Sequence, residues 1–265
     1  MTLIQIIVLS LIQGLTEFLP VSSSAHLILG SKVFGWPDQG LVFDVATHFG
    51  TLLAVIVYFR HELLGMAGCW LHPVITAEDR QNRAMFVYLA LASMATLFIG
   101  FLAYDMIAEH LRDVRVIALA TIGFGILLWV ADVVGKDQKG IESINIRSAL
   151  LIGLAQACSL IPGASRSGVT ITAGRLIGLS ADAAARFSFL LSIPVIAAAG
   201  GYGFLKTLQG SAGIDWVQFL VATLVAALAG WVCIAAFLAL LRRVGLLPFI
   251  IYRLVLGAVL LWLVF

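Results

Sequence analysis

The sequence predicts an all-α polytopic membrane protein made of two inverted-topology repeats, each a re-entrant helix hairpin followed by three transmembrane helices. Three observations predict this fold: a strongly apolar composition, a series of long uncharged segments, and motifs that recur in the same order in both halves. We expect a single membrane domain over residues 1–265, with internal repeats of about residues 1–135 and 145–265.

The composition is that of a chain surrounded by lipid. Of the 265 residues, 62% are hydrophobic and 11% are charged, and the mean hydropathy is +1.07. A soluble domain is about half apolar and about a quarter charged. The absence of strict alternation argues against an outer-membrane barrel. Helices long enough to cross roughly 30 Å of hydrocarbon are predicted at residues 43–59, 84–104, 116–131, 187–205, 217–241 and 248–265.

The two halves share short motifs in a common order. FLPVSSSAH and LIPGASRSG each have a serine three residues after a proline, which pairs Ser23 with Ser165. Two later segments, FDVATHFGTLLAV and FSFLLSIPVIAAA, carry the helix-perturbing residues Gly50 and Pro194 seven positions after their first phenylalanine. Each half then closes on glycine, an apolar stretch and Leu-Leu-Trp. This order indicates a duplication.

The first element of each half is unusual. Residues 3–34 and 148–180 are apolar at both ends, yet they hold proline, serines and a charged residue in the middle. Non-helical backbone is tolerated at membrane depth only where protein buries it or a wet cavity solvates it. We therefore interpret both segments as re-entrant hairpins. Each half then adds three spans, an odd number, so the second half is inserted upside down.

Loop charges predict the orientation. One side carries eight basic residues: Arg60, Arg80, Arg83, Lys136, Lys139, Arg147, Arg242 and Arg243. The other side carries four: Lys32, Arg112, Arg115 and Lys206. The positive-inside rule makes the first side cytoplasmic and puts both termini outside. The first hairpin then enters from outside and the second from the cytoplasm, so that their tips meet. Because the basic residues lie in loops, the net charge of +2 does not predict a nucleic-acid partner.

The first hairpin concentrates polar side chains at its break. Gln13 and Glu17 are four residues apart and share one face of a helix. Pro20 ends that helix, and the residues that follow include Ser22, Ser23, Ser24 and His26. A carboxylate within a membrane is a functional candidate by default. The alternative is that the serines and the histidine only bond backbone between packed helices.

The second hairpin contains PGASRSGVT, a segment suited to an anion. Small residues let the backbone approach a ligand, and the following helix directs its free N–H groups toward it. Arg166 adds a planar guanidinium that fits phosphate oxygens. Further donors are Ser165, Ser167 and Thr170. The alternative is a structural kink in which Arg166 pairs with Glu17, an arrangement that is compatible with phosphate binding.

Together the two tips supply a carboxylate, hydroxyls, an imidazole and an anion cradle. Phosphoryl transfer needs a positioned nucleophile, a proton carrier and positive charge around the transferred group. A site near the bilayer midplane with apolar walls implies a substrate with a lipid tail. The sequence therefore predicts phosphoryl transfer on a lipid phosphate.

At these residues the chain resembles the bacitracin-resistance type of undecaprenyl-diphosphate phosphatase. That family carries an (E/Q)xxxE motif, a Ser/His stretch and a second motif, PGxSRSxxT. Here they read Gln13-Gly-Leu-Thr-Glu17, then Pro-Val-Ser-Ser-Ser-Ala-His26, and Pro162-Gly-Ala-Ser-Arg-Ser-Gly-Val-Thr170. The resemblance covers the whole chain, including FSFLLSIP and the terminal PFIIYR.

The resemblance implies hydrolysis of undecaprenyl diphosphate to undecaprenyl phosphate at a bacterial inner membrane, with the site open to the periplasmic side. This reaction recycles the lipid carrier for cell-wall synthesis and confers resistance to bacitracin. The resemblance also implies a divalent cation, Mg²⁺ or Ca²⁺, with Glu17 as its main ligand and Gln13 as a weaker one. The catalytic positions are Glu17, Ser23, His26 and Arg166, and the phosphate-binding positions are Ser22, Ser165, Ser167 and Thr170.

Several alternatives stay open at this point. A transporter or flippase of phosphorylated polyprenyl lipids shares the plan of inverted repeats and broken helices. The nucleophile is Ser23 with His26 as proton carrier, or His26 itself, or metal-bound water. Asp44 and His48 share a helix face and either extend the site or serve as helix caps and interhelical bonds. Arg253 either joins the site or snorkels to the surface. No feature of the sequence predicts an oligomeric state.

Overall fold

The computed structural model describes residues 1–36, 39–71, 75–110, 113–135, 138–209 and 214–263, and over these ranges it contains helices and no named strand. The all-helical class predicted from the sequence is confirmed. The elements are α1 (Leu3–Glu17), α2 (Ser23–Phe34), α3 (Gly40–Tyr58), α4 (Arg60–Gly68), α5 (Ala77–His110), α6 (Val114–Val134), the 3₁₀ turn η1 (Ile141–Ser143), α7 (Ile146–Gln156), the 3₁₀ turn η2 (Ala157–Leu160), α8 (Arg166–Leu176), α9 (Ala181–Gln209), α10 (Trp216–Val244) and α11 (Leu247–Trp262).

Five of these helices are long and apolar enough to cross a membrane: α3, α5, α6, α9 and α10. The chain is therefore a multi-pass membrane protein. The sixth predicted span corresponds to α11, which has 16 residues. At 1.5 Å per residue it is about 24 Å long, shorter than a typical hydrocarbon core. Five of the six predicted spans thus meet the length criterion.

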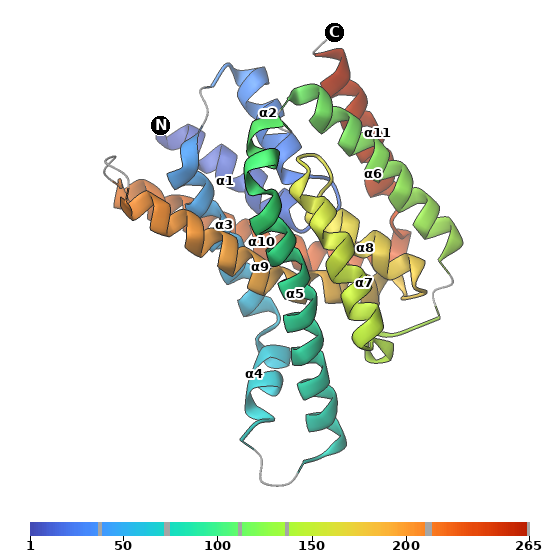
Figure 1. Cartoon of the computed structure of the whole chain (residues 1–265). Coiled ribbons are helices and arrows are strands. Elements are labelled where there is room, and N and C mark those ends of the chain that lie inside the picture. The colour runs from blue at the N-terminus through green and yellow to red at the C-terminus, as the bar shows by residue number, and fades with distance from the viewer. Residues whose placement is uncertain (37–38, 72–74, 111–112, 136–137, 210–213, 264–265) are drawn as a thin grey trace.

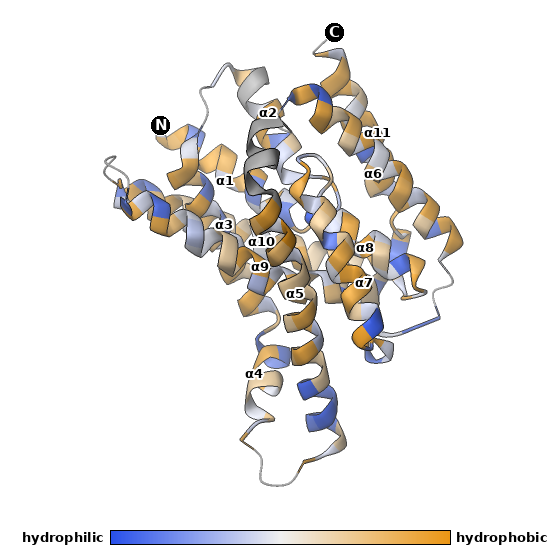
Figure 2. Cartoon of the chain, viewed as in Figure 1, coloured by the Kyte–Doolittle hydropathy of each residue, from blue (hydrophilic) through white to orange (hydrophobic). Residues whose placement is uncertain are grey.

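The spans pack in two groups around the broken helices (Figure 1). α10 lies against α1 and α3, and α3 also contacts α9. On the opposite side of the view, α6 packs against α11. α4 and the beginning of α5 extend away from this body, and Figure 2 shows that this end of α5 is hydrophilic where its middle is hydrophobic. The short helix α4 was not predicted.

The two predicted hairpins are present as helix pairs. α1 begins at a capping box, in which the Gln5 N–H donates to Thr2 Oγ1 at 3.3 Å and the Thr2 N–H donates to Gln5 Oε1 at 2.9 Å. It ends before Pro20, which has no N–H with which to continue a helix. The second pair, α7 and α8, is separated by η2 and by residues 161–165. Both breaks therefore fall at the prolines that predicted them.

Gly50 has a different role from the predicted one. α3 continues through Gly50 without a break, just as α9 continues through Pro194. A Cβ at Gly50 would overlap the carbonyl oxygen of Thr223 and would lie 2.8 Å from the Cβ of Ala226. The glycine therefore permits close approach of α3 and α10. The contact is fixed by Thr223 Oγ1, which donates to the Ala46 carbonyl at 2.9 Å.

A buried aromatic cluster lies next to the hairpin tips. Phe18 and Phe189 meet edge to face, with ring centroids 5.4 Å apart, and Phe237 packs on Phe189 at 5.7 Å. All three rings are buried. Because Phe18 follows Glu17 directly, this cluster anchors the end of α1 from which the acidic side chain projects.

Candidate functional site

Each helix break contains one strained serine. Ser22 has φ 73° and Ser165 has φ 69°, and within the described residues no other residue except glycine has a positive φ. Ser165 Oγ accepts from the Gly168 N–H at 3.2 Å, and Ser22 Oγ accepts from the Ala25 N–H at 3.4 Å. Each serine therefore caps the helix that follows it. A positive φ at a non-glycine residue is uncommon and clusters at functional sites.

The two tips meet, as the sequence predicted. Ser167 Oγ in the second hairpin donates to the Leu19 carbonyl in the first at 2.7 Å. In the other direction, the Gly163 N–H donates to Ser24 Oγ at 3.4 Å. Residues more than 130 positions apart in the chain are therefore joined at one place.

Glu17 is the centre of the polar network. Its Oε2 accepts from Gln13 Nε2 at 2.9 Å and from Ser23 Oγ at 3.1 Å. Its Oε1 forms an ion pair with Nη2 of Arg166 at 3.3 Å. The side chains of Glu17 and Arg166 are 9% and 11% exposed, so the pair is largely shielded from solvent. The predicted Glu17–Arg166 pairing is confirmed, and Ser23 contacts the same carboxylate.

Arg166 is held from two sides. While Nη2 contacts Glu17, Nη1 donates to the Ser188 carbonyl on α9 at 3.0 Å. The Thr170 hydroxyl lies 2.6 Å from Ser188 Oγ and donates to the Arg166 carbonyl at 2.9 Å. The guanidinium therefore has a fixed orientation, which bidentate recognition of phosphate requires.

Arg253 on α11 joins both tips. Its side chain is completely buried and donates to four backbone carbonyls. They belong to Thr121 (3.0 Å), Pro20 (3.3 Å), Gly163 (2.9 Å) and Ala164 (2.7 Å). The snorkelling interpretation of Arg253 is therefore wrong. The guanidinium satisfies carbonyls that the irregular loops would otherwise leave without donors.

A cavity of about 210 Å³ lies between the two tips. Its lining combines the charged pair with hydroxyls and one imidazole: Glu17, Ser22, Ser23, Ser24, His48, Ser159, Ile161, Gly163, Ser165 and Arg166. Five of the predicted site residues thus line one cavity: Glu17, Ser22, Ser23, Ser165 and Arg166. Such a group of donors around a fixed guanidinium suits a phosphate or diphosphate group.

His26 does not line this cavity. Its Nδ1 lies 2.7 Å from the Ser22 carbonyl, and its Nε2 lies 2.7 Å from the Tyr252 hydroxyl. A carbonyl only accepts, so Nδ1 carries a proton and donates. This placement does not support the predicted role of His26 as proton carrier. The ring instead holds the carbonyl of the strained Ser22 in place.

Three other predicted residues also face protein. Ser167 and Thr170 use their hydroxyls on Leu19, Arg166 and Ser188, and neither lines the cavity. Gln13 is fully buried and orients Glu17 through Nε2. The placement of Ser167 and Thr170 therefore differs from the predicted contacts with phosphate, whereas Gln13 Oε1 has no hydrogen-bond partner among the described residues and its role as a metal ligand stays a prediction. Hydroxyls inside a helix readily turn back to the preceding carbonyls, and the sequence pattern does not reveal this.

Two residues that line the cavity, His48 and Ser159, are not among the predicted catalytic and phosphate-binding residues. His48 lines the cavity, whereas its predicted companion Asp44 does not. Ser159 enters from η2, which lies within the segment 148–180 that we interpreted as the second hairpin. The signal for His48 was its position as an imidazole inside an apolar span. For Ser159 the signal was a serine close to the proline that breaks the second hairpin.

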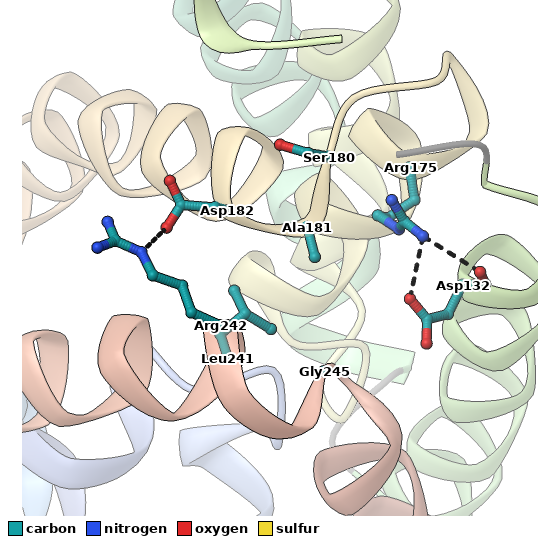
Figure 3. A pocket seen from close by; sticks show the side chains of 8 residues that line it. All are labelled: Asp132, Arg175, Ser180, Ala181, Asp182, Leu241, Arg242 and Gly245. Atoms are coloured by element: carbon teal, nitrogen blue, oxygen red, sulfur yellow. Dashed lines mark hydrogen bonds and ion pairs between the residues drawn. The ribbon is translucent and has the colours of Figure 1, made fainter. Parts of the chain in front are cut away.

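A second, larger cavity of about 410 Å³ lies away from the tips. Figure 3 shows its lining, with Arg175 beside Asp132 and Arg242 beside Asp182. The two ion pairs measure 3.3 Å and 2.8 Å. Each cation already contacts a carboxylate, and the candidate nucleophile Ser23 lines the other cavity. We therefore place the candidate site in the smaller cavity.

The donor set for a metal ion is small. Within the described part of the chain, no three His, Cys, Asp or Glu side chains lie close enough together to hold one. The cavity offers the Glu17 carboxylate, the His48 imidazole and several hydroxyls. This set fits a hard divalent cation only if phosphate oxygens of a substrate supply further ligands.

The fold and the site define a class: a multi-pass membrane protein with a polar cavity between two helix hairpins. The family model for bacitracin resistance protein BacA matches residues 6–259, and the chain belongs to that family.

Curated relatives match over nearly their full lengths. The chain is 51% identical over 269 residues to a Colwellia psychrerythraea protein named undecaprenyl-diphosphatase, with 99% of each chain covered. It is 52% identical to undecaprenyl-diphosphatase 2 of Stutzerimonas stutzeri, with 98% of each covered. It is 47% identical to the undecaprenyl-diphosphatase of Alteromonas mediterranea, with 100% of each covered.

Proposed function

We propose that this protein is a membrane phosphatase that hydrolyses undecaprenyl diphosphate to undecaprenyl phosphate and phosphate. The relatives named undecaprenyl-diphosphatase support the reaction, and membership of the bacitracin resistance family fits it. The structural observation that carries the proposal is that Ser23 and Arg166 contact the same carboxylate, Glu17, on the wall of one cavity.

In the first step, Ser23 Oγ attacks the terminal phosphorus. The Ser23 hydroxyl already donates to Glu17 Oε2, so the proton passes to Glu17 as the new P–O bond forms. The bond between the terminal phosphorus and the bridging oxygen breaks, and undecaprenyl phosphate leaves with the electron pair. Arg166 stabilises the negative charge on the transferred group.

In the second step, water attacks the phosphoserine phosphorus. The P–O bond to Ser23 breaks as Glu17 returns its proton to the Ser23 oxygen, and phosphate leaves with both protons of the attacking water. The fixed orientation of Arg166 serves both steps, because each passes through a transferring phosphoryl group. Direct attack by His26 would require its ring to leave the Ser22 carbonyl and Tyr252.

We further propose that a divalent cation, Mg²⁺ or Ca²⁺, enters with the diphosphate. Glu17 would hold the ion from the protein side, and diphosphate oxygens would supply further ligands. The ion would neutralise charge that develops on the oxygens of the transferred group. Gln13 would keep the carboxylate oriented from behind.

The inverted repeat is proposed from the packing pattern as well as the motifs. Exchanging α1, α3, α5 and α6 with α7, α9, α10 and α11, in that order, maps the most extensive contacts among these helices onto other observed contacts. The α1–α10 contact maps onto α7–α5, and α3–α10 maps onto α9–α5, while α6–α11 and α3–α9 map onto themselves. Such a pattern is expected for two halves related by a two-fold axis.

We place the protein in the bacterial inner membrane, with the cavity open to the periplasmic side. The eight-to-four distribution of basic loop residues supports this orientation. Arg112 and Lys136, one from each group, lie outside the described residues. The bilayer and the lipid diphosphate are the partners that this assignment requires. A lipid transporter or flippase is the second candidate, and the names of the relatives do not favour it.

The test is release of phosphate from undecaprenyl diphosphate by purified protein in detergent, with and without chelator. A flippase needs a bilayer and releases no phosphate, so release supports the phosphatase. Arg166→Lys keeps the charge but loses the bidentate geometry, so activity should fall by about 10²-fold or more. The matched control is Arg186→Lys, at the partly exposed ion pair with Glu62, which should stay near wild type. The absence of phosphate release by the wild type would refute the proposed function.

A further inference from the structure

We propose that His48 is a diphosphate-binding residue, which contacts the anion through Nε2. The inference rests on the proposed function, because it concerns the same cavity and the same class of ligand. His48 belongs to α3, outside both motifs, and it lines the cavity together with Glu17, Ser23 and Arg166.

The hydrogen bonds of the ring fix which nitrogen is available. His48 Nδ1 lies 2.7 Å from the Asp44 carbonyl, four residues back in the same helix. A carbonyl only accepts, so Nδ1 carries a proton. Nε2 is the other polar atom of the ring, and none of the described residues forms a hydrogen bond with it. His26 differs, because both of its nitrogens have partners and its ring lies outside the cavity lining.

The composition of the cavity lining favours a phosphate group as the ligand of Nε2. The ionisable side chains of the lining are Glu17, Arg166 and His48. Glu17 and Arg166 neutralise each other in their ion pair, so the lining adds no net positive charge to that of the cation proposed to enter with the diphosphate. A phosphate oxygen or a phosphate hydroxyl can form a hydrogen bond with Nε2 of His48, which the ion pair of the lining does not occupy.

The hydrogen bond between Ser23 and Glu17 favours a binding role for His48. It makes His48 unnecessary as the group that takes the proton from the nucleophile. The hydroxyl of Ser23 already donates to Glu17, which is therefore the proton acceptor in place. Close packing fixes the backbone near His48: Gly50 lies two residues further on, against α10, and permits no larger side chain. The His48 ring is therefore already held in position before the anion binds, so that binding costs little conformational entropy at this residue.

The experiment measures binding and turnover separately in His48→Leu and His48→Gln. Binding of methylenediphosphonate, which the reaction cannot cleave, is followed by calorimetry, and phosphate release from undecaprenyl diphosphate gives KM and kcat. Loss of a hydrogen bond to a charged group should weaken binding by about 10- to 100-fold in His48→Leu. His48→Gln keeps a donor amide and should lose less. KM should rise in parallel, while kcat changes less than about threefold.

The control is His61→Leu, which removes an exposed histidine on α4 and should bind as the wild type does. Size exclusion and thermal unfolding in detergent check the fold. If His48→Leu does not fold, His48→Asn replaces it, since its shorter amide cannot reach as far into the cavity.

Unchanged binding of methylenediphosphonate in a folded His48 variant would overturn the inference. A fall in kcat with unchanged binding would also overturn it, because it would assign His48 to proton transfer. If the wild type releases no phosphate but binding depends on His48, the proposed function fails and the binding site stands.

Discussion

Ser22 and Ser165 share a positive φ at the two helix breaks, with φ angles of 73° and 69°. Each hydroxyl caps the following helix and lies close to a second hydroxyl two residues on, Ser24 at 3.1 Å and Ser167 at 3.2 Å. This match differs by one residue from the sequence motif, which pairs Ser23 with Ser165. In the structural register, Ser23 corresponds to Arg166. The predicted nucleophile and the predicted phosphate-binding group therefore occupy equivalent positions in the two hairpins.

The positive φ leads to a prediction about stability. Ser165→Gly keeps the favourable φ and a reasonable N-cap, so thermal unfolding in detergent should change little. Ser165→Ala keeps the strained φ and loses the hydroxyl cap, and it should cost about 1 kcal/mol or more. Equal destabilisation by both substitutions would show that the backbone conformation contributes nothing. At Ser22 we likewise expect substitution by alanine to destabilise the protein more than substitution by glycine.

The sequence predicted the helices and the break points because both depend on local signals. Long apolar runs give the spans, and Pro20 and Pro162 each mark a helix break. The meeting of Glu17 and Arg166 was also predictable, since an unpaired charge in a membrane needs a partner.

The direction of individual side chains was not predictable in the same way. His26 lies one helical turn from Ser22 and turns back to its carbonyl, whereas His48, far away in the sequence, reaches the cavity. Which histidine lines the cavity depends on how α3 packs beside the hairpins. This packing is part of the tertiary structure and leaves no local signal in the sequence. The four carbonyl partners of Arg253 come from three separate segments, so a single sequence does not reveal them.

Arg253 should be more important for stability than for chemistry. Arg253→Ala leaves four buried carbonyls without their donor and should lower the free energy of unfolding by several kcal/mol. Arg253→Lys offers a single ammonium group with different geometry and should recover only part of this loss. Thermal unfolding in detergent measures both effects. Arg243→Ala, which removes an exposed arginine at the end of α10, is the control. Wild-type stability of Arg253→Ala would contradict the proposed joining of the two tips.

The orientation can be tested by labelling single cysteines with a membrane-impermeant thiol reagent. Cys158 is exposed and must first be replaced by serine, while Cys69 and Cys233 are buried. Ser143→Cys, in the connection between the halves, should react only from the cytoplasmic face. Gln209→Cys, at the end of α9, should react only from outside. Reversed labelling would invert the orientation, and labelling of both from one side would contradict the odd number of crossings between them.

The last prediction concerns the nucleophile. Ser23 Oγ lies 3.1 Å from Glu17 Oε2 on the cavity wall, whereas the ring of His26 is bonded at both nitrogens outside the cavity lining. Turnover that is stopped with acid should therefore trap a phosphoserine, which survives acid, and Ser23→Ala should lose about 10³-fold or more in kcat. His26→Ala should slow turnover by disturbing the Ser22 carbonyl, yet it should still form the acid-stable adduct. An acid-labile adduct that vanishes in His26→Ala would assign the attack to His26. Substantial activity of Ser23→Ala without any adduct would assign it to water, because only a water molecule can replace the hydroxyl without forming a bond to the protein.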